Sequence, residues 1–172
     1  MKVVKKQKNS RNCIICGMEN ALGVQAPFYN MEDGSVGSLF SFKSAHQSYP
    51  GRTHGGMISA FLDEIAGRAL WVKSANIYGV TTTMNVTFRK PVPYETPLIA
   101  RGKILSESSM FFSAIAAIYD SDGTLLAECS ARYVKLTPEK TFDKSVHEDE
   151  EMCYDVKDGV TEINFPFDKS FE

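Results

Sequence analysis

The stretch that decides the fold is residues 54–71, with the sequence HGGMISAFLDEIAGRALW. Residues 57–71 predict a helix whose apolar side chains occupy every angular sector. A helix that is apolar on all sides is buried on all sides. The stretch is too short and too interrupted to cross a membrane. It therefore predicts the central core helix of a soluble domain.

A carboxylate, Asp63, stands in the middle of this apolar helix. Burying it is costly unless it is paired or neutralised. Its neighbours at helical spacing are all small, and they are Ser59, Ala60, Ala66 and Gly67. The helix surface there is a dent that could admit a ligand or a water. Glu64 precedes Arg68 by four residues, an ion-pair spacing. We interpret Asp63 as the working acid and Glu64 as structural, with a purely structural Asp63 as the open alternative.

The start of the helix adds a second feature. Gly55 and Gly56 let a ligand approach the backbone closely. The first amides of a helix have no internal partner, and the helix dipole favours negative charge there. These amides could hold an oxyanion while Asp63 activates water, an arrangement that suits acyl transfer. His54, taken alone, is more typical of a capping or packing residue.

Composition limits the other possibilities. The chain has 172 residues, enough for one domain with a real core, and its formal net charge is −2. No global basic field indicates nucleic acid as a partner, and no long apolar run indicates a membrane span. The basic first residues lead into no hydrophobic region, so we expect no signal peptide and a cytoplasmic protein.

The chain has four cysteines, and Cys13 and Cys16 have the spacing of a metal or redox pair. A structural zinc site needs four ligands, usually from two such pairs, and the sequence has no second pair. A site could be completed only by chance of folding, from His46, His54, Cys129 or Cys153. We expect a plain turn with reduced thiols and no metal.

The remaining pattern predicts strands and turns. Residues 1–12 are expected to be a flexible, solvated basic terminus, residues 13–137 the folded domain, and residues 138–172 an acidic extension. Two strands precede the helix and four follow it, at 22–29, 36–42, 79–89, 98–107, 110–119 and 124–136. Strands joined by short turns imply an antiparallel sheet. The expected fold is α+β, a strongly curved sheet wrapped around the helix.

Several motifs together resemble one family. They are His54-Gly55-Gly56 with Asp63 downstream, Gly-Val-Thr from Gly79, residues 85–92 (NVTFRKPV), residues 46–51 (HQSYPG), and residues 13–17 (CIICG) with Asn20 and Gly23. Over residues 13–137 the chain resembles the HGG-motif, PaaI-like branch of hotdog-fold acyl-CoA thioesterases.

The resemblance implies a curved antiparallel sheet around a long central helix. It also implies homodimers, or dimers of dimers, with active sites at the interface. Asp63 matches the catalytic carboxylate, Gly55 the residue whose amide polarises the thioester carbonyl, and His54 the histidine that shapes the site. Thr81 matches a hydroxyl that orients water from the partner subunit. Coenzyme A enters as part of the substrate, and no separate cofactor is expected.

Substrate contacts follow from the same resemblance, at Gly56, Gln47, Ser48, Arg89 and Lys90. Several relatives have Asn or Gln where this chain has the shorter Ser48, with Gln47 beside it. Arg89 and Lys90 could hold coenzyme A phosphates or form a solvated strand end. Strand alternation places Thr81 on the side of Thr83 and away from Met84 and Val86.

Two other functions remain open. A hydratase or dehydratase of β-hydroxyacyl thioesters would pair a histidine with an acid, as His46 could do with Asp63 or Glu64, although the HGG motif argues against it. A non-catalytic acyl-CoA-binding sensor of this fold usually carries a DNA-binding segment, for which residues 1–12 are too short.

Overall fold

The computed structural model describes residues 1–141, 154–166 and 168–171. The strands are β1 (Val3–Lys6), β2 (Tyr29–Met31), β3 (Val36–Phe40), β4 (Tyr78–Phe88), β5 (Leu98–Glu107), β6 (Phe111–Asp120) and β7 (Leu125–Leu136). The helices are α1 (Gly55–Arg68), the short α2 (Pro138–Thr141), and the 3-10 turns η1 (Ser44–His46), η2 (Ala69–Val72) and η4 (Lys169–Phe171). No helix in these residues has the length and apolar character needed to cross a bilayer.

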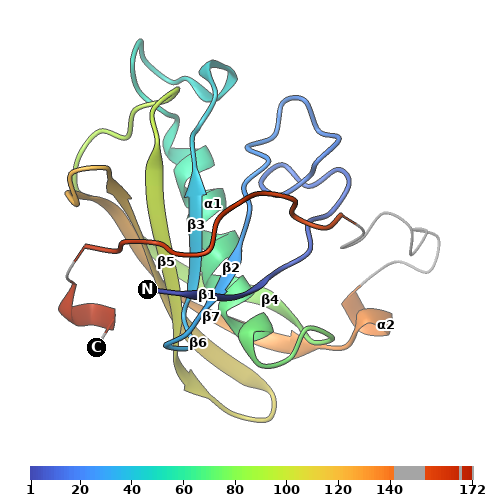
Figure 1. Ribbon diagram of the computed structural model, residues 1–172. Helices are drawn as coiled ribbons and strands as arrows, with labels where there is room; N and C mark the ends of the chain where they lie inside the picture. The colour runs from blue at the N-terminus through green and yellow to red at the C-terminus, as the bar shows by residue number, and fades with distance from the viewer. Residues whose placement is uncertain (142–153, 167, 172) are drawn as a thin grey trace.

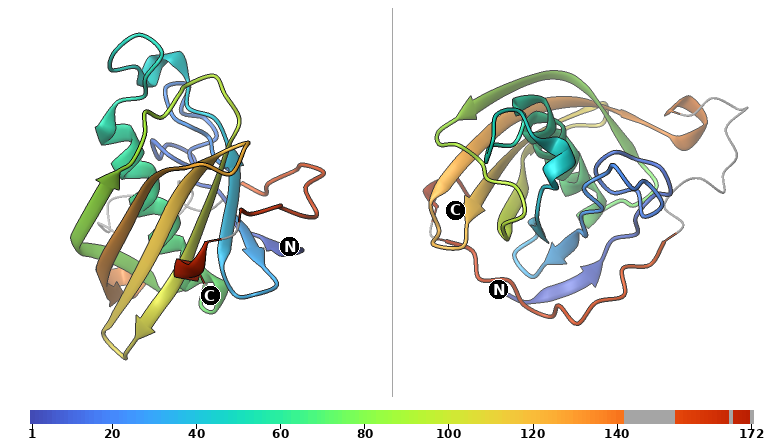
Figure 2. Two further views of the ribbon diagram at one scale, coloured as in Figure 1. Left: turned by 90° about the vertical axis from the view of Figure 1, so that its left-hand side faces the viewer. Right: turned by 90° about the horizontal axis from the view of Figure 1, so that it is seen from above.

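One antiparallel sheet has the strand order β1-β2-β3-β5-β6-β7-β4. Figures 1 and 2 show this sheet curving around α1, with β1 and β4 at its two ends. The expected α+β hotdog arrangement is therefore confirmed. The predicted strands agree with the structure to within a few residues, except for the first.

The central helix is held by apolar side chains on most of its surface. Phe61, Leu62 and Ile65 are completely buried, and the Phe61 ring stacks on Phe40 with centroids 3.7 Å apart. The sheet approaches the helix closely at Gly102 of β5. A Cβ at that position would lie 2.7 Å from the main-chain oxygen of Ile65, so any side chain there would push the sheet away from α1.

The predicted strand over residues 22–29 is wrong, because only Tyr29–Met31 pairs as a strand. Gln25 has φ 58°, a left-handed conformation that interrupts an extended chain, and Pro27 lacks the amide hydrogen that a ladder requires. Val24 and Phe28 are still buried in the core around α1. The apolar residues therefore signalled burial rather than strand pairing.

The expectation of a frayed terminus over residues 1–12 is also wrong. β1 pairs with β2, and Val3 packs beside Tyr29 and Met31. Asn9 is completely buried and donates to the main-chain oxygen of Ala26 at 2.9 Å. Lysines are common on edge strands, where they discourage further pairing, so their number here did not indicate disorder.

The C-terminal strap, which we define as residues 154–166 and 168–171, runs along the outer side of β1 and the neighbouring strands (Figures 1 and 2). Its backbone bonds to the N-terminal segment, from Val3 N to Thr161 O and from Ile163 N to Met1 O, each at 2.9 Å. Ile163 is buried against Tyr29. Residues 142–153, 167 and 172 of the predicted acidic extension lie outside the described residues, as does Cys153.

Candidate active site

The carboxylate of Asp63 is half-buried on α1 and accepts two hydrogen bonds on the same oxygen. Thr81 Oγ1 on β4 donates to Asp63 Oδ1 at 2.7 Å. The Tyr133 hydroxyl on β7 donates to Oδ1 at 3.0 Å and lies 3.1 Å from the main-chain oxygen of Asp63. The two strands therefore fix the position of one oxygen of the acid.

Thr81 reaches Asp63 of its own chain because β4 contains an irregularity. Thr81 pairs with Tyr133 and Thr83 with Arg132, so Thr82 is an extra residue in the ladder. Such a bulge reverses the alternation of side chains beyond it. The prediction that Thr81 shares a side with Thr83 is therefore wrong. The role of Thr81 in orienting water stays a prediction.

Tyr133 is a partner of Asp63 that nothing in the sequence linked to it. Its ring stacks on Phe112 with centroids 4.6 Å apart and is almost completely buried. Burial raises the pKa of the Tyr133 phenol, and the nearby charge of Asp63 raises it further. Tyr133 therefore stays protonated and acts as a hydrogen-bond donor.

At the start of α1, His54 is the N-cap. Its Nδ1 accepts from the Gly56 amide at 2.9 Å, so the ring proton is on Nε2 and the Gly56 amide is occupied. Within the described residues no acceptor is bonded to the Gly55 amide. The Phe88 ring at the end of β4 lies beside Gly55, and a Cβ on Gly55 would be 3.5 Å from Phe88 Cζ, an ordinary van der Waals contact. Gly55 therefore presents the first available donor of the helix.

Gly55 and Asp63 lie on the same helix but far apart. They are eight residues apart, which at the helical rise corresponds to about 12 Å. A thioester carbonyl bound at the Gly55 amide would therefore be out of reach of the Asp63 carboxylate of the same chain.

A pocket of about 260 Å³ lies against Asp63. Its walls include Thr81, Tyr78 and Tyr133 from the sheet, and Cys13 and Cys16 from the loop before β2. Of the four small neighbours predicted to form a dent around Asp63, only Gly67 lines this pocket, and the loop with the two cysteines is a wall that the sequence did not link to Asp63.

The other predicted contacts are partly occupied within the chain. Gln47 Oε1 accepts from the Tyr94 hydroxyl at 2.7 Å, and Ser48 is an exposed loop residue. Arg89 is 55% exposed and pairs with Glu128, while Lys90 is exposed next to it. Both cations follow Phe88, so they lie at the Gly55 end of the helix rather than the Asp63 end.

His46 is buried, and both of its ring nitrogens are bonded to the backbone. Nδ1 accepts from Lys43 N at 3.0 Å, which leaves the proton on Nε2, and Nε2 lies 2.6 Å from Leu22 O. Its main-chain oxygen accepts from His54 N at 2.8 Å. His46 therefore holds the loop that precedes α1.

The predicted ion pair between Glu64 and Arg68 is confirmed, with Arg68 Nε 2.7 Å from Glu64 Oε1. Arg68 is only 2% exposed, and its guanidinium lies over the Phe28 ring. Glu64 also lies beside the two cysteines, which are free thiols. A hydrogen bond from Cys16 lowers the pKa of the Cys13 thiol to about 6, and the same bond together with burial raises the pKa of Cys16.

Comparison with known proteins identifies relatives of this domain. Residues 50–127 match the model of the thioesterase superfamily. Mouse acyl-coenzyme A thioesterase THEM4 is 30% identical over 125 residues, which are 71% of this chain and 53% of the mouse protein. The bovine THEM4 protein is 27% identical over 128 residues, 73% of this chain and 52% of that protein. The chain thus spans about half the length of these relatives.

Solved structures agree. A crystal structure of a thioesterase superfamily protein is 27% identical, with a TM-score of 0.66, and the match covers 72% of this chain and 63% of that one. Zebrafish thioesterase superfamily member 2 is 19% identical with a TM-score of 0.60, covering 69% and 86%. A hypothetical thioesterase from Streptococcus pneumoniae, crystallised with coenzyme A, is 19% identical with a TM-score of 0.59, covering 65% and 86%. The last two show the shared fold.

Proposed function

Because the chain belongs to the hotdog-fold thioesterase superfamily, we propose that it hydrolyses an acyl-CoA thioester to a carboxylic acid and free coenzyme A. The observation that carries this proposal is the carboxylate of Asp63, held by Thr81 and Tyr133 beside an open pocket. Within the superfamily, the His54-Gly55-Gly56 sequence favours the HGG-motif branch.

In the proposed reaction, Asp63 takes a proton from water as the water oxygen attacks the thioester carbonyl carbon. The carbonyl oxygen becomes an oxyanion, which the amide at the helix start stabilises. The carbon–sulfur bond then breaks, and the coenzyme A thiolate leaves and takes up a proton. Thr81 and Tyr133 donate to Asp63, so they fix its direction, and no metal is required.

The site combines two copies of the chain. The amide of Gly55 and the carboxylate of Asp63 are separated by about 12 Å along one helix, too far to act on one carbonyl. A second copy with its α1 antiparallel to the first would bring one chain's Gly55 to the other chain's Asp63. The exposed edge strand β4 offers the backbone groups for such pairing.

The coenzyme A end of the substrate is assigned to the Gly55 end of α1. Arg89 and Lys90 stand there on exposed positions, and each suits phosphate oxygens. Arg89 would have to leave Glu128, which makes Lys90 the stronger candidate. Gln47 and Ser48 lie in the loop before the helix.

Free thiols at Cys13, Cys16 and Cys129 fit a reducing compartment such as the cytoplasm.

The hydratase alternative is weakened by His46. A histidine that moves a proton at carbon needs a free ring nitrogen, and both nitrogens of His46 are bonded to the backbone. A non-catalytic acyl-CoA-binding protein remains distinguishable by assay, since it would bind the thioester without releasing a thiol.

The test is a hydrolysis screen over acyl-CoAs of increasing chain length and aryl-acetyl-CoAs, with free thiol as the readout. On the best substrate, Asp63→Asn should lower the turnover number by about 10² to 10⁴, because it removes the general base. The matched neighbour variant Glu64→Gln should lose far less turnover, with any cost appearing in thermal stability because buried Arg68 loses the charge of Glu64 beside it. An active Asp63→Asn beside an inactive, folded Glu64→Gln would refute the assignment.

A further inference from the structure

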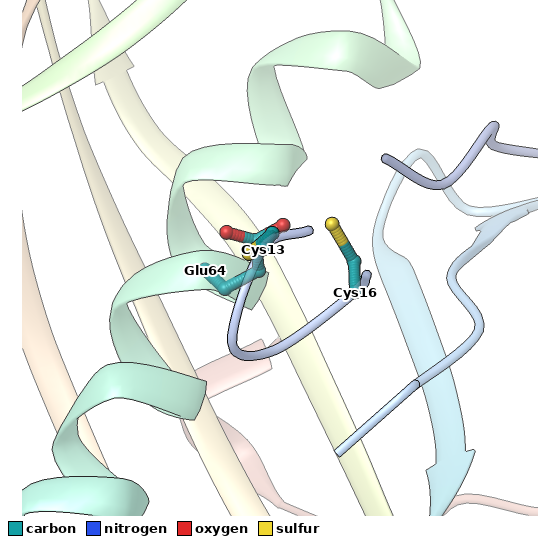
Figure 3. A group of neighbouring side chains, drawn as sticks. All are labelled: Cys13, Cys16 and Glu64. Carbon is teal, nitrogen blue, oxygen red and sulfur yellow. The ribbon is translucent and has the colours of Figure 1, made fainter. Parts of the chain in front are cut away.

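A second cluster of reactive side chains borders the pocket and has no part in the proposed hydrolysis. Three ligand atoms lie within 4.8 Å of one another: Cys13 Sγ, Cys16 Sγ and one carboxylate oxygen of Glu64. Figure 3 shows the loop with both cysteines passing in front of α1, with the Glu64 carboxylate directed toward them. We propose that these three residues bind a zinc ion that ties the loop to the central helix.

The distances are close to those that zinc requires. Two thiolates on a tetrahedral zinc, each about 2.3 Å from the metal, are about 3.8 Å apart, and a carboxylate oxygen is slightly closer to each sulfur. The observed upper limit of 4.8 Å leaves a contraction of at most about 1.0 Å between the two sulfurs and about 1.3 Å between a sulfur and the carboxylate oxygen. Cys13 and Glu64 are both partly exposed, so rotation of their side chains would supply this contraction.

The loop is built to present its sulfurs. The Gly17 amide donates to Cys13 O at 2.8 Å and closes the turn, and the Ile15 amide donates to Cys13 Sγ at 3.3 Å. A Cβ on Gly17 would lie 2.4 Å from Cys13 O, so only glycine fits immediately after Cys16.

The charges also suit a divalent cation. Two thiolates and Glu64 carry three negative charges, and buried Arg68 supplies one positive charge beside them. The remaining two negative charges equal the charge of Zn²⁺, so the cluster with its ion is neutral in a largely buried setting. Thiolate ligands favour zinc over magnesium or calcium.

A fourth ligand position is available on the pocket side. The pocket of about 260 Å³ that the cysteines share with Asp63 has room for a water molecule. Ser10 Oγ lies 3.1 Å from Cys16 Sγ and can accept a hydrogen bond from such a water. The ion would thus stabilise one wall of the pocket. Its ligand Glu64 follows Asp63 in the sequence, but the ion takes no part in the proposed reaction.

Sequence alone predicts no metal here, because a second cysteine pair is absent. The fold supplies a carboxylate from α1 instead, about fifty residues away in the chain. Glu64 was predicted to pair with Arg68, and Arg68 Nε lies 2.7 Å from Glu64 Oε1.

The test uses the full chain, reduced, stripped of metal with a chelator and then titrated with Zn²⁺ alone. We expect one ion retained per chain after dialysis, and Co²⁺ bound in its place should show a thiolate-to-cobalt charge-transfer band. Removal of the ion should lower the melting temperature, while carboxylate-based hydrolysis should persist in the metal-free protein below that temperature.

Three variants make the result decisive. Cys13→Ser and Cys16→Ser should each weaken retention of Zn²⁺ and reduce the cobalt band, and Glu64→Gln should weaken retention while keeping the band. Cys129→Ser, a buried free cysteine outside the cluster, should retain the ion fully. If the reduced, folded wild-type chain retains no Zn²⁺, or if both cysteine variants retain it as the wild type does, the proposal is overturned.

Discussion

At the scale of single residues, the two donors to Asp63 make separable predictions. Thr81→Val keeps the shape of the side chain and removes its hydroxyl, so the carboxylate loses its shorter bond, 2.7 Å. A slightly misdirected base should lower kcat by about 10-fold or more, with KM changed far less. Steady-state kinetics on the best acyl-CoA would check this. A raised KM with unchanged kcat would instead make Thr81 a substrate contact.

Tyr133→Phe is the companion measurement for the same carboxylate. It removes the longer bond, 3.0 Å, and leaves the stacking on Phe112 in place. The loss of kcat should therefore be smaller than for Thr81→Val. In the double variant the two losses should not be additive, because both donors act on one group.

The residue-level features that sequence predicted are those decided by local spacing. The Glu64–Arg68 pair is four residues apart on a helix, and the small neighbours of Asp63 are one turn away, so both follow from helical geometry. The partners of Asp63 come from two strands, and the bulge at Thr82 inverts the alternation on which the side of Thr81 was predicted. A bulge of this kind leaves no periodic signature, so these contacts required the folded chain.

At the scale of elements, the start of α1 depends on its cap. His54 Nδ1 accepts from the Gly56 amide, and its removal in His54→Ala should cost about 1 kcal/mol of stability. His54→Asn supplies another capping acceptor and should recover most of it. Thermal unfolding of the two variants would test this. Equal melting temperatures for alanine and asparagine variants would show that His54 acts through packing rather than capping.

The C-terminal strap should be sensitive to acid. Asp158 accepts from Tyr29 Oη at 2.6 Å and from Lys6, and Asp168 accepts from Tyr119. Partial burial alone would raise the pKa of each carboxyl, but these bonds, with those from neighbouring strap residues, hold both below the usual value. The folded pKa is depressed, so the contribution to stability is complete above the unfolded value of about 3.9 and is lost as the pH falls through the lower, folded value.

Hydrogen-exchange protection factors in residues 154–166, measured by NMR from about pH 7 to about pH 2, should therefore fall at the acid end before those in β5–β7 do. Asp158→Asn with Asp168→Asn should lower the strap protection factors already at neutral pH. Asp155→Asn is the control, because the Asp155 side chain is 69% exposed and its contact with Lys8 is long, at 3.8 Å. Uniform exchange across strap and sheet at every pH would contradict a separately held strap.

Long elements were predictable, and short ones were not. α1 and β4–β7 have sustained periodicity, and their predicted limits lie within a few residues of those observed. β1 has four residues rich in lysine, and β2 has three, so neither has a periodic pattern to detect. The N-terminal segment that contains β1 also bonds to the strap, across more than a hundred and fifty residues of sequence.

At the scale of the whole molecule, the curved sheet ends at β4 with an exposed edge. This strand has 11 residues, and Val80 and Phe88 on it are 40% and 53% exposed. A long exposed edge with apolar side chains favours pairing with another copy. We expect a homodimer, or a dimer of dimers, by light scattering, in agreement with the 12 Å separation of Gly55 and Asp63 along one helix.

The decisive experiment is complementation between two inactive chains. Gly55→Pro removes the amide hydrogen, and proline is tolerated at the first helical position, where His54 already has the extended conformation that a following proline requires. Gly55→Ala keeps the amide and is the matched control. Gly55→Pro and Asp63→Asn should each be nearly inactive alone, since every site in either homodimer lacks one group.

After subunit exchange in an equal mixture, half of the dimers should be mixed. In each mixed dimer one site joins an intact Gly55 to an intact Asp63, and the other site lacks both. The mixture should therefore recover about a quarter of wild-type activity. Recovery would show that the two groups act across the interface, because no single chain in the mixture carries both. If exchange is confirmed by mass spectrometry and no activity returns, the two groups do not meet across a dimer, and the shared-site mechanism fails.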